Sequence, residues 1–189
     1  SQGHPFGSNA PANAIFYEAL ETGMGGFTLS EVKVPEGLSA VWQHTSQYKC
    51  MKATAYFNNT NYESESWLIS PEIDLSGYTD CYFTFDHAGL YFGDITQEAT
   101  VWISKDGGDW TQLMIDPNDY PASWTFMSAG EWDLASYIGS KVRFGFKYSS
   151  TAKKAGTWEV CHVAVISGKS SRAPLPDVDP TKAEWMELP

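Results

Sequence analysis

The sequence predicts an all-β protein, a two-sheet antiparallel β-sandwich of the jelly-roll type. Apolar and polar residues alternate over short segments, most clearly in 81–87 and 142–148, as they do in strands with one buried face. Gly, Pro, Asn and Asp separate these segments, and no stretch keeps the 3.6-residue period of a helix. Ten Tyr, ten Phe and eight Trp supply apolar area for a sizeable core.

The predicted strands follow one another along the chain with turn residues between them. Pro71 ends one strand because proline cannot donate to a strand ladder, and Gly107 and Gly108 supply the turn of a hairpin. The spacing Ser104-x-Asp106-x-Gly108-x-Trp110 in this hairpin resembles the Asp-box turn, which we interpret as a structural brace. The strand segments are 15–20, the weakly alternating 27–37, 41–44, 51–57, 67–70, 81–87, 99–104, 110–113, 124–127, 132–134, 142–148 and 158–166.

The same alternation assigns the core. Residues on one face of each strand should lie between the two sheets, and residues on the other face should meet solvent. Arg143, Gly145 and Lys147, for example, mark the wet face of their strand. We expect the following residues to be buried: Trp67, Phe83, Phe85, Phe144, Phe146, Trp158 and Val160.

Composition changes at both ends of the sandwich segment. Residues 1–13 are small, polar and proline-bearing, and we expect a flexible lead-in. Residues 14–167 carry the strand pattern and should form the sandwich domain. Residues 168–189 begin as a linker rich in Pro and Ser and become apolar again. That tail is expected either to cap the sandwich or to begin a following domain.

The charge disfavours two classes of partner, and the cysteine count argues against a disulfide scaffold. The formal net charge of −11 disfavours nucleic acid and anionic membrane surfaces, because both are bound by basic patches. No apolar run approaches 18 residues, so we expect no membrane insertion. Cys50, Cys81 and Cys161 are too few for a disulfide scaffold. They are expected to be buried thiols, with a Cys50–Cys81 pair as the alternative.

Several motifs together resemble a known family. The most specific is Trp67-Leu68-Ile69-Ser70-Pro71-Glu72-Ile73-Asp74-Leu75-Ser76. Further matching segments are 83–88, 101–108, 133–139, 142–148 and 156–160. This pattern resembles the choice-of-anchor J and cleaved-adhesin domains, which are jelly-roll sandwiches related to galactose-binding and MAM domains. The resemblance covers about Ile15 to Ile166.

The resemblance carries expectations about location and activity. Such domains occur in secreted, periplasmic or outer-membrane surface proteins of anaerobic Gram-negative bacteria. They are generally non-catalytic modules beside hydrolases, proteases or surface anchors, and some bind Ca²⁺ or glycans. Related domains place a carboxylate on the first strand, matching Glu18 here, and an Asp where this chain has Cys161. Because Ca²⁺ takes oxygen ligands, Glu18 is a tentative ligand and the cysteine argues against a complete site.

The sequence offers little for catalysis. Cys161 and His162 are neighbours on a predicted strand, so their side chains should point to opposite faces and form no dyad. His44, His87 and His162 could converge on a metal, although satisfied core or rim histidines are the favoured interpretation. Asp86 and Glu159 lie inside strands and are interpreted as structural carboxylates. A glycan-active hydrolase that uses these two carboxylates remains the alternative.

Aromatic residues at predicted loop tips are the better functional lead, because exposed rings offer flat apolar faces on which sugar rings stack. We name Tyr91, Phe92, Tyr120, Trp124 and His87 as candidate ligand-binding residues, with closure of the sandwich ends as the alternative role for the aromatic rings. The favoured hypothesis is therefore a secreted or surface module, not an enzyme, that binds a carbohydrate or a protein partner. An accessory domain of a larger secreted nuclease or protease is a further alternative.

Overall fold

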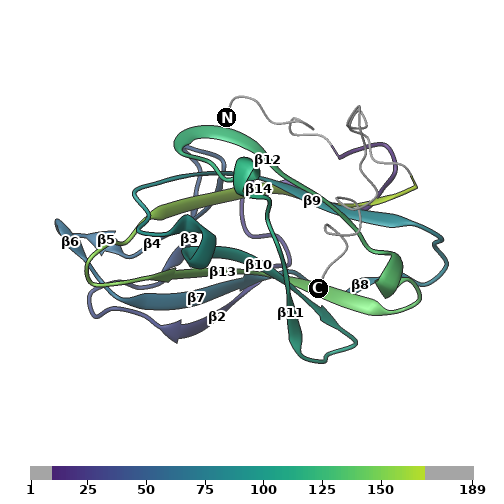
Figure 1. Ribbon diagram of the computed structural model, residues 1–189, viewed down its shortest axis with the longest axis horizontal. Helices are drawn as coiled ribbons and strands as arrows, with labels where there is room; N and C mark the ends of the chain where they lie inside the picture. Colours follow the sequence, from purple (N-terminus) through teal and green to yellow (C-terminus); the bar gives the residue numbers. More distant parts are fainter. Residues whose placement is uncertain (1–9, 169–189) are drawn as a thin grey trace.

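Two antiparallel sheets face each other in the computed structural model, which describes residues 10–168 (Figure 1). The all-β prediction is confirmed, since the helical segments of these residues have only three or four residues each. They are α1 (Ile95–Glu98) and the 3₁₀ turns η1 (Pro117–Asp119) and η2 (Ala135–Tyr137). In the described part of the chain, no helix is long and apolar enough to cross a bilayer.

The upper layer in Figure 1, sheet A, has the strand order β12-β9-β14-β4-β3. Its sixth strand, β1, pairs with β14 beyond the end of β4, so β1 and β4 share one edge of that strand. The strands of sheet A are β1 (Ala14–Glu18), β3 (Trp42–Thr45), β4 (Cys50–Thr54), β9 (Cys81–Leu90), β12 (Ser123–Asp133) and β14 (Thr157–Ser167).

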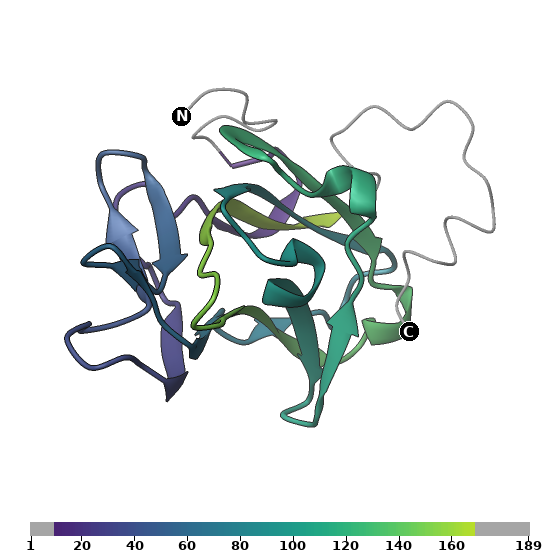
Figure 2. The ribbon, with the colours of Figure 1, turned by 60° about the vertical axis from the view of Figure 1, so that its left-hand side comes forward.

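The lower layer, sheet B, has the order β11-β10-β13-β7-β2, with the short β8 also paired to β13. A separate hairpin of β5 and β6 projects from one end of the sandwich (Figure 2). The strands of sheet B and of this hairpin are β2 (Thr28–Lys33), β5 (Tyr56–Phe57), β6 (Thr60–Asn61), β7 (Ser64–Ile69), β8 (Ile73–Asp74), β10 (Ala99–Lys105), β11 (Trp110–Leu113) and β13 (Lys141–Ser150).

Aromatic rings from both sheets fill the space between the layers. Phe83 of sheet A stacks on Phe144 of sheet B with ring centroids 3.8 Å apart and planes 4° apart. Phe85 meets Phe146 edge to face at 4.9 Å. These four residues, with Trp158 and Val160, are fully buried, which confirms six of the seven core predictions. Such pairs add to the stabilisation that burial alone gives.

Trp67 is the exception, and the prediction for it is wrong. It is partly exposed on the outer face of sheet B, while Ser64, Ser66 and Leu68 of the same strand point inward. The indole of Trp42 explains the inward serines: it is buried, and its Nε1 donates to the carbonyl oxygen of Ser66 at 3.2 Å. Small inward side chains on β7 leave room for that ring, so the large residue of β7 faces out.

The hairpin brace predicted at the β10–β11 turn is present. Asp106 and Gly107 both have positive φ (51° and 73°), the conformation that a two-residue hairpin turn matching the strand twist requires. Ser104 Oγ donates to the carbonyl oxygen of Gly108 at 2.7 Å. Asp106 Oδ1 accepts from the backbone N–H of Lys141 at 2.9 Å, which ties the turn to β13.

The ends of the sandwich meet at one edge. Ala14 of β1 pairs with Ile166 of β14, and the Nδ2 group of Asn13 donates to the carbonyl oxygen of Ser167 at 2.6 Å. The first strand begins at Ala14, and the division into lead-in, sandwich and tail stays a prediction. The rest of the predicted lead-in and tail, residues 1–9 and 169–189, lies outside the described residues.

Candidate functional site

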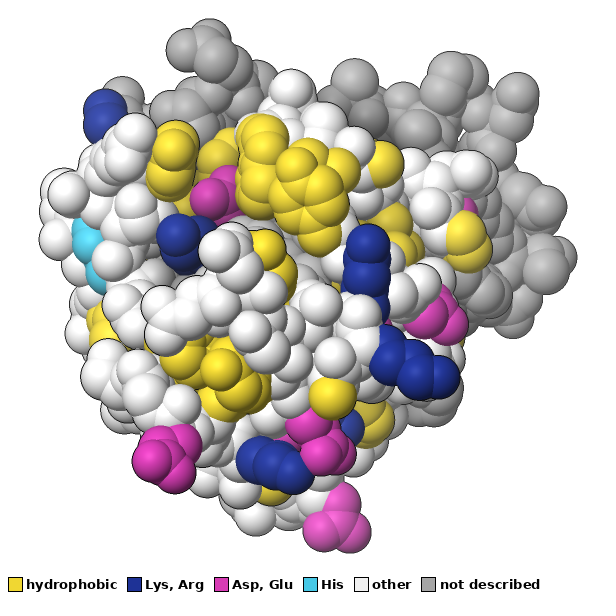
Figure 3. Space-filling view, turned by 90° about the vertical axis from the view of Figure 1, so that its left-hand side faces the viewer, with side chains coloured by type: hydrophobic (Ala, Val, Ile, Leu, Met, Phe, Trp, Pro, Cys, Tyr) yellow, Lys and Arg dark blue, Asp and Glu magenta, His cyan; other side chains and the backbone are white. Residues whose placement is uncertain are grey.

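Two of the candidate aromatics, Tyr91 and Trp124, come together at one end of sheet A. Tyr91 follows the last residue of β9, and Trp124 is the second residue of β12. Ser123 pairs with Gly89, which brings the two segments side by side. The rings lie 6.1 Å apart with planes at 68°, and Tyr91 is 62% and Trp124 47% exposed. Figure 3 faces this end of the molecule and shows hydrophobic side chains gathered on its surface.

The loop that presents Tyr91 is fixed from behind. Tyr91 has a φ of +71°, which is uncommon for a residue with a side chain and carries strain. Glu98 Oε1 accepts from the backbone N–H groups of Gly93 and Asp94, each at 3.0 Å. Asp94 in turn caps α1 by accepting from the N–H of Thr96. The exposed ring therefore sits on a backbone held by several hydrogen bonds.

Phe92 anchors this loop and is only partly exposed. Its ring lies directly over Gly156: an added Cβ there would be 2.5 Å from the ring. A Cβ at Gly89 would lie 3.1 Å from the same ring. Phe92 also packs 6.2 Å from Tyr148, whose hydroxyl donates to the carbonyl oxygen of Gly156. Because Gly89 and Gly156 have no side chains, the Phe92 ring can pack against the backbone at the end of sheet A.

Tyr120 and His87 lie deeper. Tyr120 is partly buried, and its hydroxyl donates to the carbonyl oxygen of Ala99 at 2.9 Å. His87 has no exposed surface. Its Nδ1 accepts from Nε1 of Trp158 at 3.0 Å, so its Nε2 carries the proton and donates to the carbonyl oxygen of Asp119 at 2.7 Å. Desolvation lowers the pKa of His87 to about 4. The structure does not bring His87 to the surface formed by Tyr91 and Trp124.

The prediction that Cys161 and His162 point to opposite faces is wrong, because β14 bulges between Cys161 and Ala164. His162 adopts a φ of +54°, and its N–H bonds the carbonyl oxygen of Ala19 in place of the neighbouring strand. Cys161 remains paired with Asp86, while the His162 ring also reaches Asp86. An extra residue in one strand breaks the alternation on which the prediction depended.

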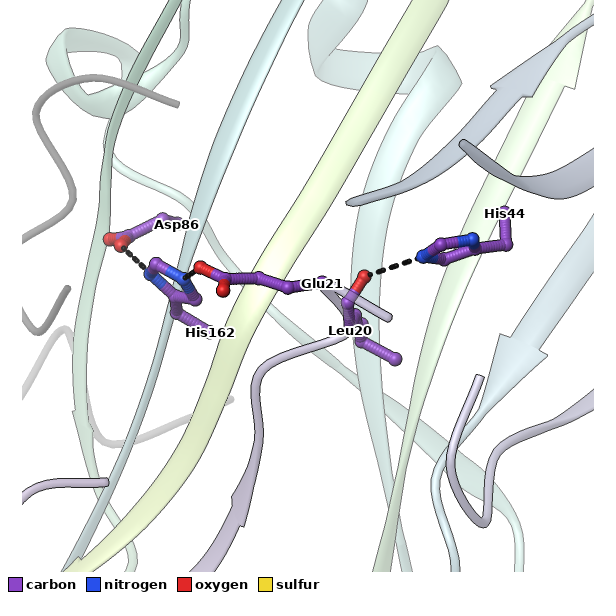
Figure 4. Close-up of polar contacts among 5 residues, drawn as sticks. All are labelled: Leu20, Glu21, His44, Asp86 and His162. Carbon is purple, nitrogen blue, oxygen red and sulfur yellow. Dashed lines mark hydrogen bonds and ion pairs between the residues drawn. The ribbon is translucent and has the colours of Figure 1, made fainter. Parts of the chain in front are cut away.

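His162 is part of a buried brace (Figure 4). Its Nδ1 lies 3.2 Å from Oδ2 of Asp86, and its Nε2 lies 2.7 Å from Oε2 of Glu21. His44 approaches the same segment from another strand, with Nε2 3.2 Å from the carbonyl oxygen of Leu20. The two histidines thus hold residues 20–21 against sheet A, and neither shares a centre with His87.

The strand carboxylates and the cysteine thiols are poorly placed for catalysis. Asp86 is fully buried and Glu159 is 4% exposed, so a substrate does not reach them from solvent. Desolvation raises the pKa of Glu159, and Lys52 opposite it in β4 only partly offsets this effect. The three cysteines are unbonded and buried, and desolvation raises the pKa of Cys81 to about 11 and that of Cys161 well above its ordinary value. Thiols in this state are weak nucleophiles.

Glu18 is on β1, paired with Val163 of β14. Its carboxylate lies so close to the backbone of Gly25 that a side chain at position 25 would collide with it. Within residues 10–168, no group of three or more His, Cys, Asp or Glu side chains is placed to hold a metal ion. The calcium site at Glu18 stays a prediction, because such a site needs six to eight oxygen ligands.

Sequence reasoning missed a second aromatic surface, on the outer face of sheet B. Trp67 lies 5.8 Å from Trp102 and 5.3 Å from Trp110, ring centre to ring centre, and all three indoles are partly exposed. We call these three residues, with Arg143 and Lys147 of β13, the tryptophan face. Trp67 and Trp102 each stand between two buried residues of their strand, whereas Trp110 does not. Only the strand register places the rings together.

Comparisons with known proteins agree on the fold. No protein-family model matches the chain, and no curated protein matches it. Among solved structures, the K1 cleaved adhesin domain of Lys-gingipain from Porphyromonas gingivalis W83 is similar with a TM-score of 0.52 and 13% identity, over 82% of this chain and 98% of that one. This likeness supports the cleaved-adhesin part of the resemblance at the level of the fold.

Two carbohydrate-binding structures are similar to the same extent. TmCBM61, solved with β-1,4-galactotriose, has a TM-score of 0.51 and 10% identity, over 80% of this chain and 95% of that one. The carbohydrate recognition domain of Emp47p has a TM-score of 0.52 and 10% identity, over 85% of this chain and 100% of that one. At these identities the likeness establishes a shared β-sandwich fold.

Proposed function

We propose that the chain is a non-catalytic carbohydrate-binding module that uses Tyr91 and Trp124 as its platform. The observation that carries the proposal is that two large rings are exposed side by side on a backbone held in place from beneath. Exposed aromatic surface costs solvation in the free protein, and a fixed platform loses little entropy when a ligand binds. Rings at a steep angle to each other offer stacking faces to two different parts of a glycan.

Polar groups suited to sugar hydroxyls lie around the platform. Ser123 and Thr125 flank Trp124 at exposed positions, and Lys154 lies against Gly93 of the Tyr91 loop. A few placed polar groups beside an apolar surface fix a ligand's orientation. Phe92 anchors the loop that carries Tyr91, and Tyr120 and His87 lie in the sandwich end and are not assigned to the platform. We propose that the module works at a cell surface or after secretion, which the likeness to an adhesin domain and to carbohydrate-binding domains supports.

The experiment measures binding of the purified domain to neutral polysaccharides, with β-1,4-galactan as the first probe because TmCBM61 was solved with a galactotriose. Tyr91→Ala and Trp124→Ala should each weaken binding about tenfold or more, which corresponds to about 1.4 kcal/mol. Tyr48→Ala is the matched control, since Tyr48 is 48% exposed on a different turn. Equal affinity in all three variants, or no binding across a panel of neutral glycans, would refute this site.

A further inference from the structure

The tryptophan face has no described element packed over it, since it is the outer surface of the lower layer in Figure 1. Its indoles come from three different strands: β7, β10 and β11. Nε1 of Trp102 donates to Oγ1 of Thr100 at 2.9 Å, and Nε1 of Trp67 reaches Oε2 of Glu65 at 3.4 Å. These contacts fix the ring planes against the sheet and leave part of each ring accessible.

Gly145 shows how closely the rings lie on the sheet. It is in β13, a central strand, directly opposite Trp102 of β10. A Cβ at this position would lie 2.8 Å from Trp67 and 3.2 Å from Trp110. Glycine weakens a strand interior and often marks a place where something approaches the backbone closely. Here the indoles use that space, so the sheet loses some strand stability and the three rings lie adjacent, with planes tilted 49° and 38° to that of Trp67.

Two cations lie among the rings. Nζ of Lys147 is 5.7 Å from the ring centres of both Trp67 and Trp102, and the guanidinium of Arg143 is 5.7 Å from that of Trp110. Lys147 lies four positions after Arg143 on the same face of β13, which corresponds to about 13 Å. That span exceeds a single sugar ring. The chain has a net charge of −11, so two cations among aromatic rings form a local positive site on an otherwise acidic protein.

We propose that the tryptophan face binds an anionic polysaccharide, with sugar rings stacked on the indoles and carboxylate or sulfate groups paired with Lys147 and Arg143. Flat apolar faces suit pyranose rings, and cations among them select charged chains over neutral ones. The site is separate from the platform of Tyr91 and Trp124 and does not depend on it. A chain ligand fits because the face crosses several strands.

The test uses two pairs of polymers that differ in charge. Polygalacturonate is compared with highly methyl-esterified pectin, and dextran sulfate with dextran, each titrated into the purified domain at low and at high salt. We expect binding to at least one anionic polymer, at least tenfold weaker binding to its neutral partner, and weakening by salt. The polymer pair in which the anionic member binds shows whether the face recognises carboxylate or sulfate groups. Equal affinity for charged and neutral partners, or no binding to either anionic polymer, overturns the proposal.

Variants locate the site. Lys147→Gln removes one charge from an outward position and should weaken anionic binding about tenfold while thermal unfolding stays as in the wild type. Trp110→Ala on the edge strand β11 should weaken it similarly through lost stacking. Lys153→Gln, an exposed cation outside sheet B, is the charge-matched control. If Lys153→Gln weakens binding as much as Lys147→Gln, the attraction is general and the proposed site is wrong. Loss of galactan binding in Tyr91→Ala tests only the platform of Tyr91 and Trp124 and says nothing about the tryptophan face.

Discussion

Acidification should destabilise this protein through His87, a residue that the structure holds neutral. Its Nδ1 accepts from Nε1 of Trp158 and its Nε2 donates to the carbonyl oxygen of Asp119, so protonation at Nδ1 would break the bond from Trp158. Burial lowers the pKa from its ordinary 6.5 to about 4. Protonation in the unfolded chain therefore competes with folding over that pH interval.

The sign and size follow from the two pKa values. Because the folded-state pKa lies below the unfolded one, the contribution is complete above about pH 6.5 and is lost as the pH falls toward 4. The difference is 6.5 − 4 = 2.5. At about 1.4 kcal/mol for each pH unit, the loss is about 3 kcal/mol. That is a large part of the 5–15 kcal/mol by which a typical domain is stable.

Urea unfolding at pH 7, 6, 5 and 4 measures this effect, with His87→Gln as the reference. Gln keeps one acceptor for Trp158 and one donor for Asp119 but does not titrate, so the difference between the two proteins isolates the histidine from the carboxylates. The gap in unfolding free energy should narrow by about 3 kcal/mol between pH 7 and pH 4. If the two proteins show parallel pH profiles, His87 titrates normally and the reasoning fails.

Three further predictions concern the core, catalysis and calcium. Phe146→Ala should cost about 3–5 kcal/mol in urea unfolding because the ring is fully buried, and a wild-type melting temperature would contradict the core assignment. Asp86→Asn and Glu159→Gln should change stability but no sugar-releasing activity; release by the wild type that either change abolishes would show an enzyme. Millimolar Ca²⁺ should shift the melting temperature little against chelator, whereas a large shift removed by Glu18→Gln would show a working calcium site.

The fold was predictable because apolar and polar residues alternate clearly in the strands that form the core. Phe83 and Phe85, and Phe144 and Phe146, each occupy one face of a strand, and those faces met as expected. Trp67 failed because the sequence does not show that Trp42, from another strand, needs the space behind β7. Residue size alone predicts that a tryptophan on β7 points inward. In the structure the indole of Trp42 occupies the space behind β7, so Trp67 points outward.

The candidate site was predictable only in part. Tyr91 and Trp124 could be named as loop-tip aromatics, but their contact depends on the pairing of Ser123 with Gly89, which local pattern does not encode. The bulge at His162 was equally hidden, because one residue in the left-handed region reverses the facing of its neighbours. Strand register and bulges are long-range properties, and the tryptophan face depended on them as well.

The bond between Asn13 and Ser167 has a consequence for how the module would be carried. Ser167 is the last residue of β14, and Thr157, its first, pairs with Leu90 beside the Tyr91 loop. Eleven strand residues separate the two ends, a length of roughly 35 Å. The backbone thus enters the sandwich at Asn13 and leaves it at Ser167 at a single pole. The aromatic loop lies at the opposite end of β14, so the pole where Asn13 and Ser167 meet does not obstruct the approach of a large ligand to Tyr91.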